Sequence, residues 1–187
     1  TRWIASTELP PPVRLTVSKK KGYRTSVDMV SDEGDHYRSV VLPCLKYTDY
    51  LIINEVELGK CLDRPMRDAS GSIIEEEVRK GAVELIAAGV GCLVVIHYPE
   101  GGVVASKDGT VVSAPSFSPP KEDIVSTVGA GDAFCAGALY AIHEGYGLED
   151  MLQFASACAR FNLFSTTSTG GAPTLEAVDQ FLKKQYL

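Results

Sequence analysis

The sequence predicts an α/β fold in which helices cover both faces of a mainly parallel sheet. One observation behind this prediction is an alternation: short apolar segments rich in branched residues, typical of buried strands, are followed by longer segments typical of helices. The other is size, because 187 residues that are 45% hydrophobic suffice for one domain with a sizeable core. We find no internal repeat or low-complexity segment in the chain.

The first half of the chain contains two strand patterns and three helix patterns. The clearest is Tyr50–Ile53, an apolar run whose length and branched side chains are typical of a buried strand. In chain order we expect a strand at 25–30, a helix around 35–46, the strand at 50–53, a short helix from Glu55 and, after a polar loop near 64–71, an amphipathic helix at 72–88.

A buried strand, a hairpin and three helices are expected in the second half. Lys107-Asp108-Gly109 separates two apolar runs, and an Asp-Gly pair in that setting is a strong signal for a hairpin turn. In chain order we expect a strand at 92–97, hairpin strands at 102–106 and 110–114, a loop at 115–123, and helices at 132–144, 148–164 and 175–184.

The run from Ser126 to Gly137 (Ser-Thr-Val-Gly-Ala-Gly-Asp-Ala-Phe-Cys-Ala-Gly) carries the most chemical information. Gly129, Ala130 and Gly131 let the backbone turn sharply and approach a ligand closely. The helix that follows offers unpaired N–H groups and the positive end of its dipole, which favour a phosphate or a developing oxyanion. Asp132, beside them, can accept a proton from an incoming hydroxyl. The pattern indicates phosphoryl transfer to an alcohol, and an ordinary glycine-rich turn before a buried helix is the alternative interpretation.

This run resembles the C-terminal signature of the PfkB, or ribokinase-like, family of carbohydrate and nucleoside kinases. The resemblance implies a three-layer αβα sandwich, ATP and Mg²⁺ as cofactors, Asp132 as the catalytic base, and Gly129 to Gly131 as the anion hole for the transferred phosphoryl group. Thr127, in the same run, is expected to contact the nucleotide. Relatives commonly begin the run with Asp-Thr, and that Asp often helps to hold a monovalent cation. Ser126 takes its place here, so dependence on potassium (K⁺) stays open.

A second motif follows the strand at 50–53. Asn54-Glu55-Val56-Glu57 resembles the family's Asn-x-x-Glu element, which implies that Asn54 and Glu57 position Mg–ATP. An amide and a carboxylate suit magnesium because this ion prefers oxygen ligands and keeps much of its water. Glu57 is the stronger candidate of the two. Taken without the family's order of motifs, Asn54 would be a helix N-cap and the glutamates a solvated first turn.

The resemblance places four further residues near the nucleotide. The segment from His97 to Gly102 would correspond to the family's Thr-x-Gly-x-x-Gly element, in which Gly102 is kept and His97 replaces the threonine. Ser156 falls where many relatives place an asparagine near the adenine. Gly170 belongs to a loop, 166–171, that resembles the segment closing over the adenine. A core histidine, close packing in an Ala-rich helix and a plain linker are the corresponding structural alternatives.

Composition excludes some classes of function. A net charge of -6 argues against a general nucleic-acid or anionic-membrane surface. The sequence has no apolar stretch of the roughly 18 residues that a membrane-spanning helix needs, and no evident signal peptide. The five cysteines are scattered and lack metal-ligand spacing, as expected of small buried side chains in a reducing compartment. We therefore expect a cytoplasmic protein whose partners are small molecules.

Family enzymes are well over half as long again as this chain, and their first half carries sugar-binding residues and a β lid without a counterpart here. We therefore expect a fragment, in which residues 1–21 are a leader or a remnant of the N-terminal half and residues 22–187 form the nucleotide-binding and catalytic domain. Pro10 to Pro12 favour extended polyproline structure in the first of these segments.

The expected function is ATP-dependent transfer of the γ-phosphate to a hydroxyl of a sugar, nucleoside or related small molecule. The alternative is a catalytically inactive nucleotide-binding or interaction module of the same fold. Because relatives often dimerise through the lid, the resemblance also leaves a homodimer open.

Overall fold

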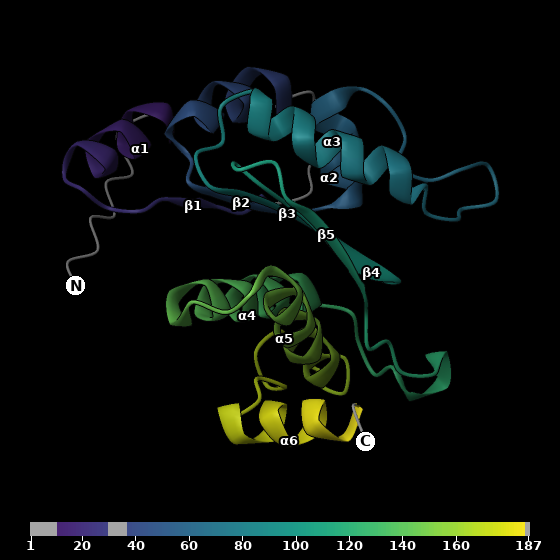
Figure 1. Cartoon of the computed structure of the whole chain (residues 1–187). Coiled ribbons are helices and arrows are strands. Elements are labelled where there is room, and N and C mark those ends of the chain that lie inside the picture. The colour runs from purple at the N-terminus through teal and green to yellow at the C-terminus, as the bar shows by residue number, and fades with distance from the viewer. Residues whose placement is uncertain (1–10, 30–36, 186–187) are drawn as a thin grey trace. The chain divides into compact units, whose positions relative to one another are not determined.

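The computed structural model describes residues 11–29 and 37–185 (Figure 1). It confirms the α/β prediction: helices alternate along the chain with the strands of a mixed, mostly parallel sheet. The strands follow the order β1-β2-β3-β4-β5 in the sheet, and β1 and β2 are parallel, with Ser26 beside Tyr50 and Val27 beside Leu51. Their bounds are β1 Ser26–Val27, β2 Tyr50–Asn54, β3 Leu93–Tyr98, β4 Gly101–Ser106 and β5 Val111–Pro115.

The chain divides into two compact units. The N-terminal unit comprises the chain up to Val95 together with residues 105–110, and the C-terminal unit comprises residues 96–104 and the chain from Val111 onward. Helices α1 (Pro11–Lys20), α2 (Glu55–Leu62) and α3 (Glu75–Ala87) belong to the first unit. Helices α4 (Ala130–Glu144), α5 (Leu148–Asn162) and α6 (Leu175–Gln185) belong to the second.

The centre of β2 is wholly buried, since Leu51, Ile52 and Ile53 expose none of their surface. A strand that is apolar at successive positions has both faces covered, which is typical of a parallel sheet between helices. β2 ends at Asn54, and α2 begins at the next residue. The buried strand therefore fixes where the Asn-x-x-Glu motif lies.

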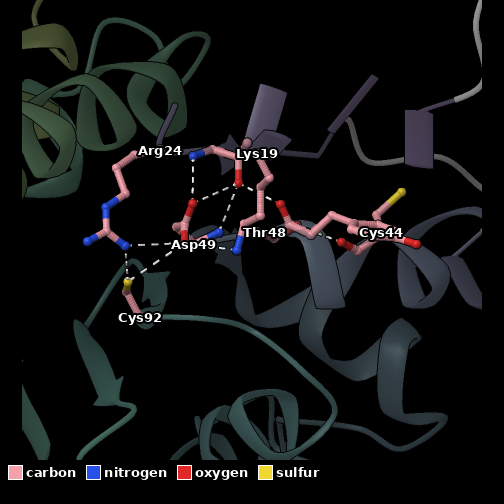
Figure 2. A network of polar contacts seen from close by, with 8 residues as sticks. Lys19, Arg24, Cys44, Thr48, Asp49 and Cys92 are labelled. Atoms are coloured by element: carbon pink, nitrogen blue, oxygen red, sulfur yellow. Dashed lines mark hydrogen bonds and ion pairs between the residues drawn. The ribbon is translucent and has the colours of Figure 1, made fainter. Parts of the chain in front are cut away.

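A buried carboxylate ties α1 and β1 to the start of β2 (Figure 2). Asp49 is 4% exposed, accepts a hydrogen bond from the Thr25 N–H at 2.9 Å, and lies 3.0 Å from the Lys19 ammonium. The Arg24 guanidinium approaches the same carboxylate at 3.4 Å. Burial opposes the ionisation of Asp49, but the Thr25 and Lys19 contacts outweigh it and hold the pKa of the carboxyl below its ordinary value. The N-terminal end of β2 is thus anchored by a fully partnered charge.

In the C-terminal unit, α4 and α5 pack closely at Gly137. A Cβ there would lie 3.0 Å from the Ala155 Cα and 3.0 Å from the Cys158 Sγ, which is tighter than ordinary contact. Absence of a side chain at Gly137 lets the two helices approach at this point. This packing brings the C-terminal end of α5 to the start of α4, where Asn162 donates to the Val128 carbonyl at 2.9 Å.

Three sequence predictions are corrected by the structure. Residues 37–47 form a short π-helix (Tyr37–Val41) and a 3-10 helix (Leu42–Tyr47) rather than the α-helix expected at 35–46. Pro43 explains part of this, because proline has no N–H to continue an α-helical ladder. Residues 35–36 lie outside the described residues.

The other two corrections concern the first 30 residues. Pro11 and Pro12 begin α1 instead of forming extended structure, because proline's fixed φ and missing N–H suit a helix start; Pro10 lies outside the described residues. The strand expected at 25–30 is paired only at Ser26 and Val27, and residue 30 is also outside. The remaining elements agree with the predictions to within three residues at each end, including the hairpin, where the Ser106 N–H donates to the Thr110 carbonyl at 2.8 Å.

Candidate active site

The N-terminus of α4 is formed by the predicted glycine-rich turn. Gly129 is the N-cap with φ +81°, and no side chain caps the helix. The N–H of Ala130 donates to the Thr127 carbonyl at 3.2 Å, whereas the N–H groups of Gly129, Gly131 and Asp132 have no acceptor among the described residues. Open N–H groups at the positive end of a 15-residue helix are of the kind that favour an anion.

Asp132 lies in the first turn of α4 and is exposed to solvent. Its carboxylate is therefore next to the open N–H groups and reachable by a small molecule. Among described residues no salt bridge involves it, and a carboxylate so placed can accept a proton. The pairing of an anion hole with a base at this turn stays a prediction.

A second loop packs directly against this turn. A Cβ at Gly129 would overlap the backbone carbonyl of Ser168, so only glycine fits at this position without a shift of the backbone. Within the same loop, the Gly170 N–H donates to the Thr167 hydroxyl at 2.9 Å. The segment 166–171, predicted from its resemblance to an adenine-closing loop, thus lies beside the glycine-rich turn.

His97 lies beneath Gly131. Its ring stacks on Phe134 with 4.8 Å between the centroids, and its Cε1 is 3.4 Å from where a Cβ on Gly131 would be. Burial lowers the pKa of His97 from 6.5 to about 4, so the imidazole is neutral near neutral pH. The side chain that packs against the turn at Gly131 is therefore uncharged, and the positive potential at the turn comes from the helix terminus.

One residue of this site was not identified from the sequence. Asn162, at the end of α5, is 1% exposed and donates its Nδ2–H to the Val128 carbonyl at 2.9 Å. The neighbouring Leu163 carbonyl accepts from the N–H groups of Val125 and Ser126 at 2.9 Å and 3.3 Å. An asparagine at the end of an apolar helix was the one visible hint, but its partner is 34 residues away.

In the N-terminal unit, Asn54 and Glu57 cap the start of α2 reciprocally. The Glu57 N–H donates to Asn54 Oδ1 at 2.8 Å, and the Asn54 N–H donates to Glu57 Oε2 at 3.0 Å. Glu57 is 2% exposed, and its charge adds to burial in raising the pKa of Cys61 to about 11. Glu55 is paired instead with Arg67, whose Nε lies 2.9 Å from Glu55 Oε1. Both interpretations of Asn54 are thus compatible, because an N-cap can also hold a carboxylate in place.

The remaining predicted residues lie in the C-terminal unit. Gly102 in β4 is buried, and a Cβ there would meet Leu152 at 3.2 Å. Thr127 is exposed on the turn that precedes α4. Ser156 is 6% exposed and lies inside α5 between two fully buried alanines. The nucleotide contacts assigned to these residues stay predictions.

The structure thus brings Gly129 to Asp132, His97 and the 166–171 loop together in one unit, and pairs Asn54 with Glu57 in the other. Among the residues that the structure describes, no group of three or more His, Cys, Asp or Glu side chains could hold a metal ion. Within the same residues, no helix combines the length and the apolar character needed to cross a membrane. All five cysteines are free thiols.

A family model described as "pfkB family carbohydrate kinase" matches residues 15–175. The chain therefore belongs to the PfkB family of carbohydrate kinases, which confirms the resemblance identified from the Ser126–Gly137 run.

Curated relatives carry the names of sugar kinases. The chain is 28% identical over 163 residues to a 5-dehydro-2-deoxygluconokinase of Bacillus subtilis, covering 87% of this chain and 46% of that protein. It is 43% identical over 65 residues to a Dictyostelium discoideum protein named an uncharacterized sugar kinase, covering 34% of this chain and 18% of the relative. The chain spans half or less of the length of the curated relatives that it matches.

Solved ribokinase structures share its fold. The chain matches a ribokinase of Thermotoga maritima with a TM-score of 0.71 and 25% identity, covering 95% of this chain and 55% of that one. It matches an Arabidopsis thaliana ribokinase complexed with ribose and ATP with a TM-score of 0.74 and 23% identity, covering 95% and 54%. The predicted ribokinase-like architecture is thereby confirmed.

Proposed function

We propose that this chain is the nucleotide-binding and catalytic part of an ATP-dependent kinase that phosphorylates a hydroxyl of a sugar or related small molecule. The observation that carries the proposal is the start of α4, where open N–H groups at the helix terminus adjoin the exposed carboxylate of Asp132. Such a terminus attracts negative charge, and a carboxylate at its rim suits removal of a proton from a neutral hydroxyl.

The reaction assigns a separate task to each group. The acceptor oxygen forms a bond to the γ-phosphorus while the bond between that phosphorus and the leaving oxygen of ADP breaks. Asp132 takes the proton that the acceptor hydroxyl loses. The N–H groups of Gly129 and Gly131, with Ala130 between them in the helix's first turn, stabilise the charge that builds up on the transferred phosphoryl oxygens.

The described residues offer a fit for a phosphate of ATP and a separate fit for its magnesium ion. The uncapped N–H groups of α4 fit a phosphate. The Glu57 carboxylate, which accepts from the Asn54 N–H, would contact a magnesium ion through water, because this ion prefers oxygen ligands and keeps much of its hydration shell. When bound, the ion would neutralise charge on the phosphates. His97, Gly102, Thr127, Ser156 and Gly170 are the proposed nucleotide contacts.

The names of relatives support a sugar as the acceptor. The Bacillus subtilis relative is named for a gluconate-derived sugar, and the Arabidopsis thaliana structure holds ribose. The sequence match to the first covers 87% of this chain. We accordingly propose a hydroxyl-bearing carbohydrate as the substrate class, ATP as the phosphate donor, and the cytoplasm, where both occur, as the location.

The test is acceptor-dependent ADP formation by the complete gene product, measured against a panel of sugars and nucleosides with Mg–ATP. An Asp132→Asn variant should fold like the wild type and lose about 10³-fold in kcat, the usual contribution of a general base. Asp150→Asn, which changes an exposed carboxylate in the first turn of α5, is the matched control and should retain activity.

Unchanged kcat in Asp132→Asn would overturn the role given to this residue. Saturable binding of Mg–ATP without ADP formation for any acceptor would overturn the kinase proposal and favour an inactive nucleotide-binding module.

A further inference from the structure

Asn162 is a buried amide of which only the nitrogen end makes a hydrogen bond to the described residues. Its Nδ2–H donates to the Val128 carbonyl, while its Oδ1 is buried and has no hydrogen-bond partner among the described residues. Exchanging the two ends of the amide would place Oδ1 against the carbonyl oxygen, and two acceptors repel. The orientation of the amide is therefore fixed by the Val128 carbonyl.

This contact determines the direction of an N–H group on the ligand side of the turn. Val128 and Gly129 share one planar, trans peptide, in which the C=O and N–H bonds point in opposite directions. Because Asn162 holds the carbonyl toward α5, the Gly129 N–H points away from α5. That N–H is one of the groups without an acceptor at the start of α4.

The stability of the fold does not account for the asparagine. A buried polar atom without a partner is destabilising, and it offsets much of what the single hydrogen bond contributes. An apolar side chain of the same shape would remove the unpartnered Oδ1 but would leave the Val128 carbonyl without its donor, so the two changes offset each other. What such a side chain could not supply is a donor that holds the Val128 carbonyl.

We propose that Asn162 is a positioning residue of the anion hole: it holds the Val128–Gly129 peptide so that the Gly129 N–H faces the transferred phosphoryl group. This inference rests on the proposed function of the α4 terminus. The Leu163 carbonyl assists from the same helix end by accepting the N–H groups of Val125 and Ser126. The end of α5 therefore holds the loop before Gly129 at three backbone groups.

The first test is an Asn162→Leu variant of the complete gene product. Its melting temperature should stay close to that of the wild type, while kcat should fall about tenfold or more and KM for ATP should change less than twofold. Val178→Ala, which removes two methyl groups from a buried residue of α6, is the control. It should lower the melting temperature and leave kcat unchanged, so that instability and mispositioning are separated.

An Asn162→Asp variant adds a readout that a purely structural role would not change. The ionised carboxylate repels the Val128 carbonyl, whereas the protonated carboxyl can donate to it. The ratio of variant to wild-type kcat should therefore rise as the pH falls from 8 toward 5. A flat ratio, or an Asn162→Leu enzyme with wild-type kcat, would overturn the proposal.

Amide hydrogen exchange tests the role of Asn162 independently of the kinase proposal. In the ligand-free protein, Asn162→Leu should speed exchange in the 125–131 segment selectively, and Val178→Ala should not. If the wild type shows no turnover with any acceptor, the proposed function fails while the exchange result still decides whether Asn162 orders the turn. Unchanged exchange in Asn162→Leu would contradict the positioning role.

Discussion

The helices α2 and α4 both begin directly at a predicted functional motif, but their first turns are opposite in character. At α2, Asn54 and Glu57 satisfy each other's backbone N–H groups, and the first turn carries the two carboxylates of Glu55 and Glu57. At α4, the N-cap is Gly129, which has no side chain, and the N–H groups of Gly129, Gly131 and Asp132 have no acceptor among the described residues.

This difference shows that a helix dipole alone does not define an anion site. The α2 terminus has used its donors internally, and its carboxylates are also engaged: Glu55 is paired with Arg67, and Glu57 accepts from the Asn54 N–H. The α4 terminus presents unused donors, so it suits an anion.

The largest expected effect comes from closing the α4 terminus with Gly129→Ala. The new Cβ would meet the Ser168 backbone at a φ of +81°, so we expect a loss of about 3 kcal/mol in the free energy of unfolding and about 100-fold in kcat. Gly145→Ala, at the other end of α4, has a similar φ of +75° with open space around it. It should cost about 1 kcal/mol in thermal or denaturant unfolding and leave kcat intact. Equal effects of the two substitutions would contradict the close packing at Gly129.

The neutral His97 ring beneath the start of α4 predicts an effect of intermediate size, in which the free energy of unfolding depends on pH. Because the folded pKa of His97 is about 4 and the unfolded value is 6.5, only the unfolded state binds the proton between these values. Stability should therefore be complete above pH 6.5 and fall by about 2 kcal/mol as the pH drops toward 4, allowing for partial exposure.

Urea unfolding at a series of pH values measures this effect. In a His97→Gln variant, the free energy of unfolding should no longer show this fall between pH 6.5 and pH 4. A His143→Gln variant, which alters an exposed histidine, should keep the wild-type dependence on pH. The same slope in all three proteins would show that His97 is not buried as a neutral ring.

The smallest expected effect comes from opening the α2 terminus with Asn54→Ala. The substitution removes the Oδ1 that accepts from the Glu57 N–H, whereas the backbone N–H that donates to Glu57 Oε2 remains. Loss of the side-chain bond should cost about 1 kcal/mol in denaturant unfolding. Asn54→Ser keeps a capping oxygen and should cost less than half as much. If the two variants are equally stable, the side-chain cap contributes nothing and the contrast between the two termini weakens.

Local patterns in the sequence predicted the elements that hold both motifs. The apolar run at 50–53, the Asp-Gly turn at 108–109 and the start of a helix after Gly131 all depend on neighbouring residues, and the structure agrees with them. The prediction of an α-helix at 35–46 was wrong because the composition of this segment fits several helix types, and Pro43 favours the 3-10 helix that the structure shows at Leu42–Tyr47.

The candidate site was predictable only in part for the same reason. The turn at Gly129 to Asp132 is local, so its open donors could be foreseen. His97 under Gly131, Ser168 against Gly129 and Asn162 on Val128 are contacts between distant segments, and single-sequence patterns do not encode them. The roles of the predicted nucleotide contacts stay predictions.

The most direct test of the central claim follows the backbone amides of the complete protein by NMR. Mg–ADP with aluminium fluoride, a mimic of the transferred phosphoryl group, is added to saturation. The account predicts saturable downfield shifts of the Gly129, Gly131 and Asp132 amide protons, with the Gly145 amide at the far end of α4 unchanged. If nucleotide binds and the amides of Gly129 and Gly131 do not move, the start of α4 is not the phosphoryl site.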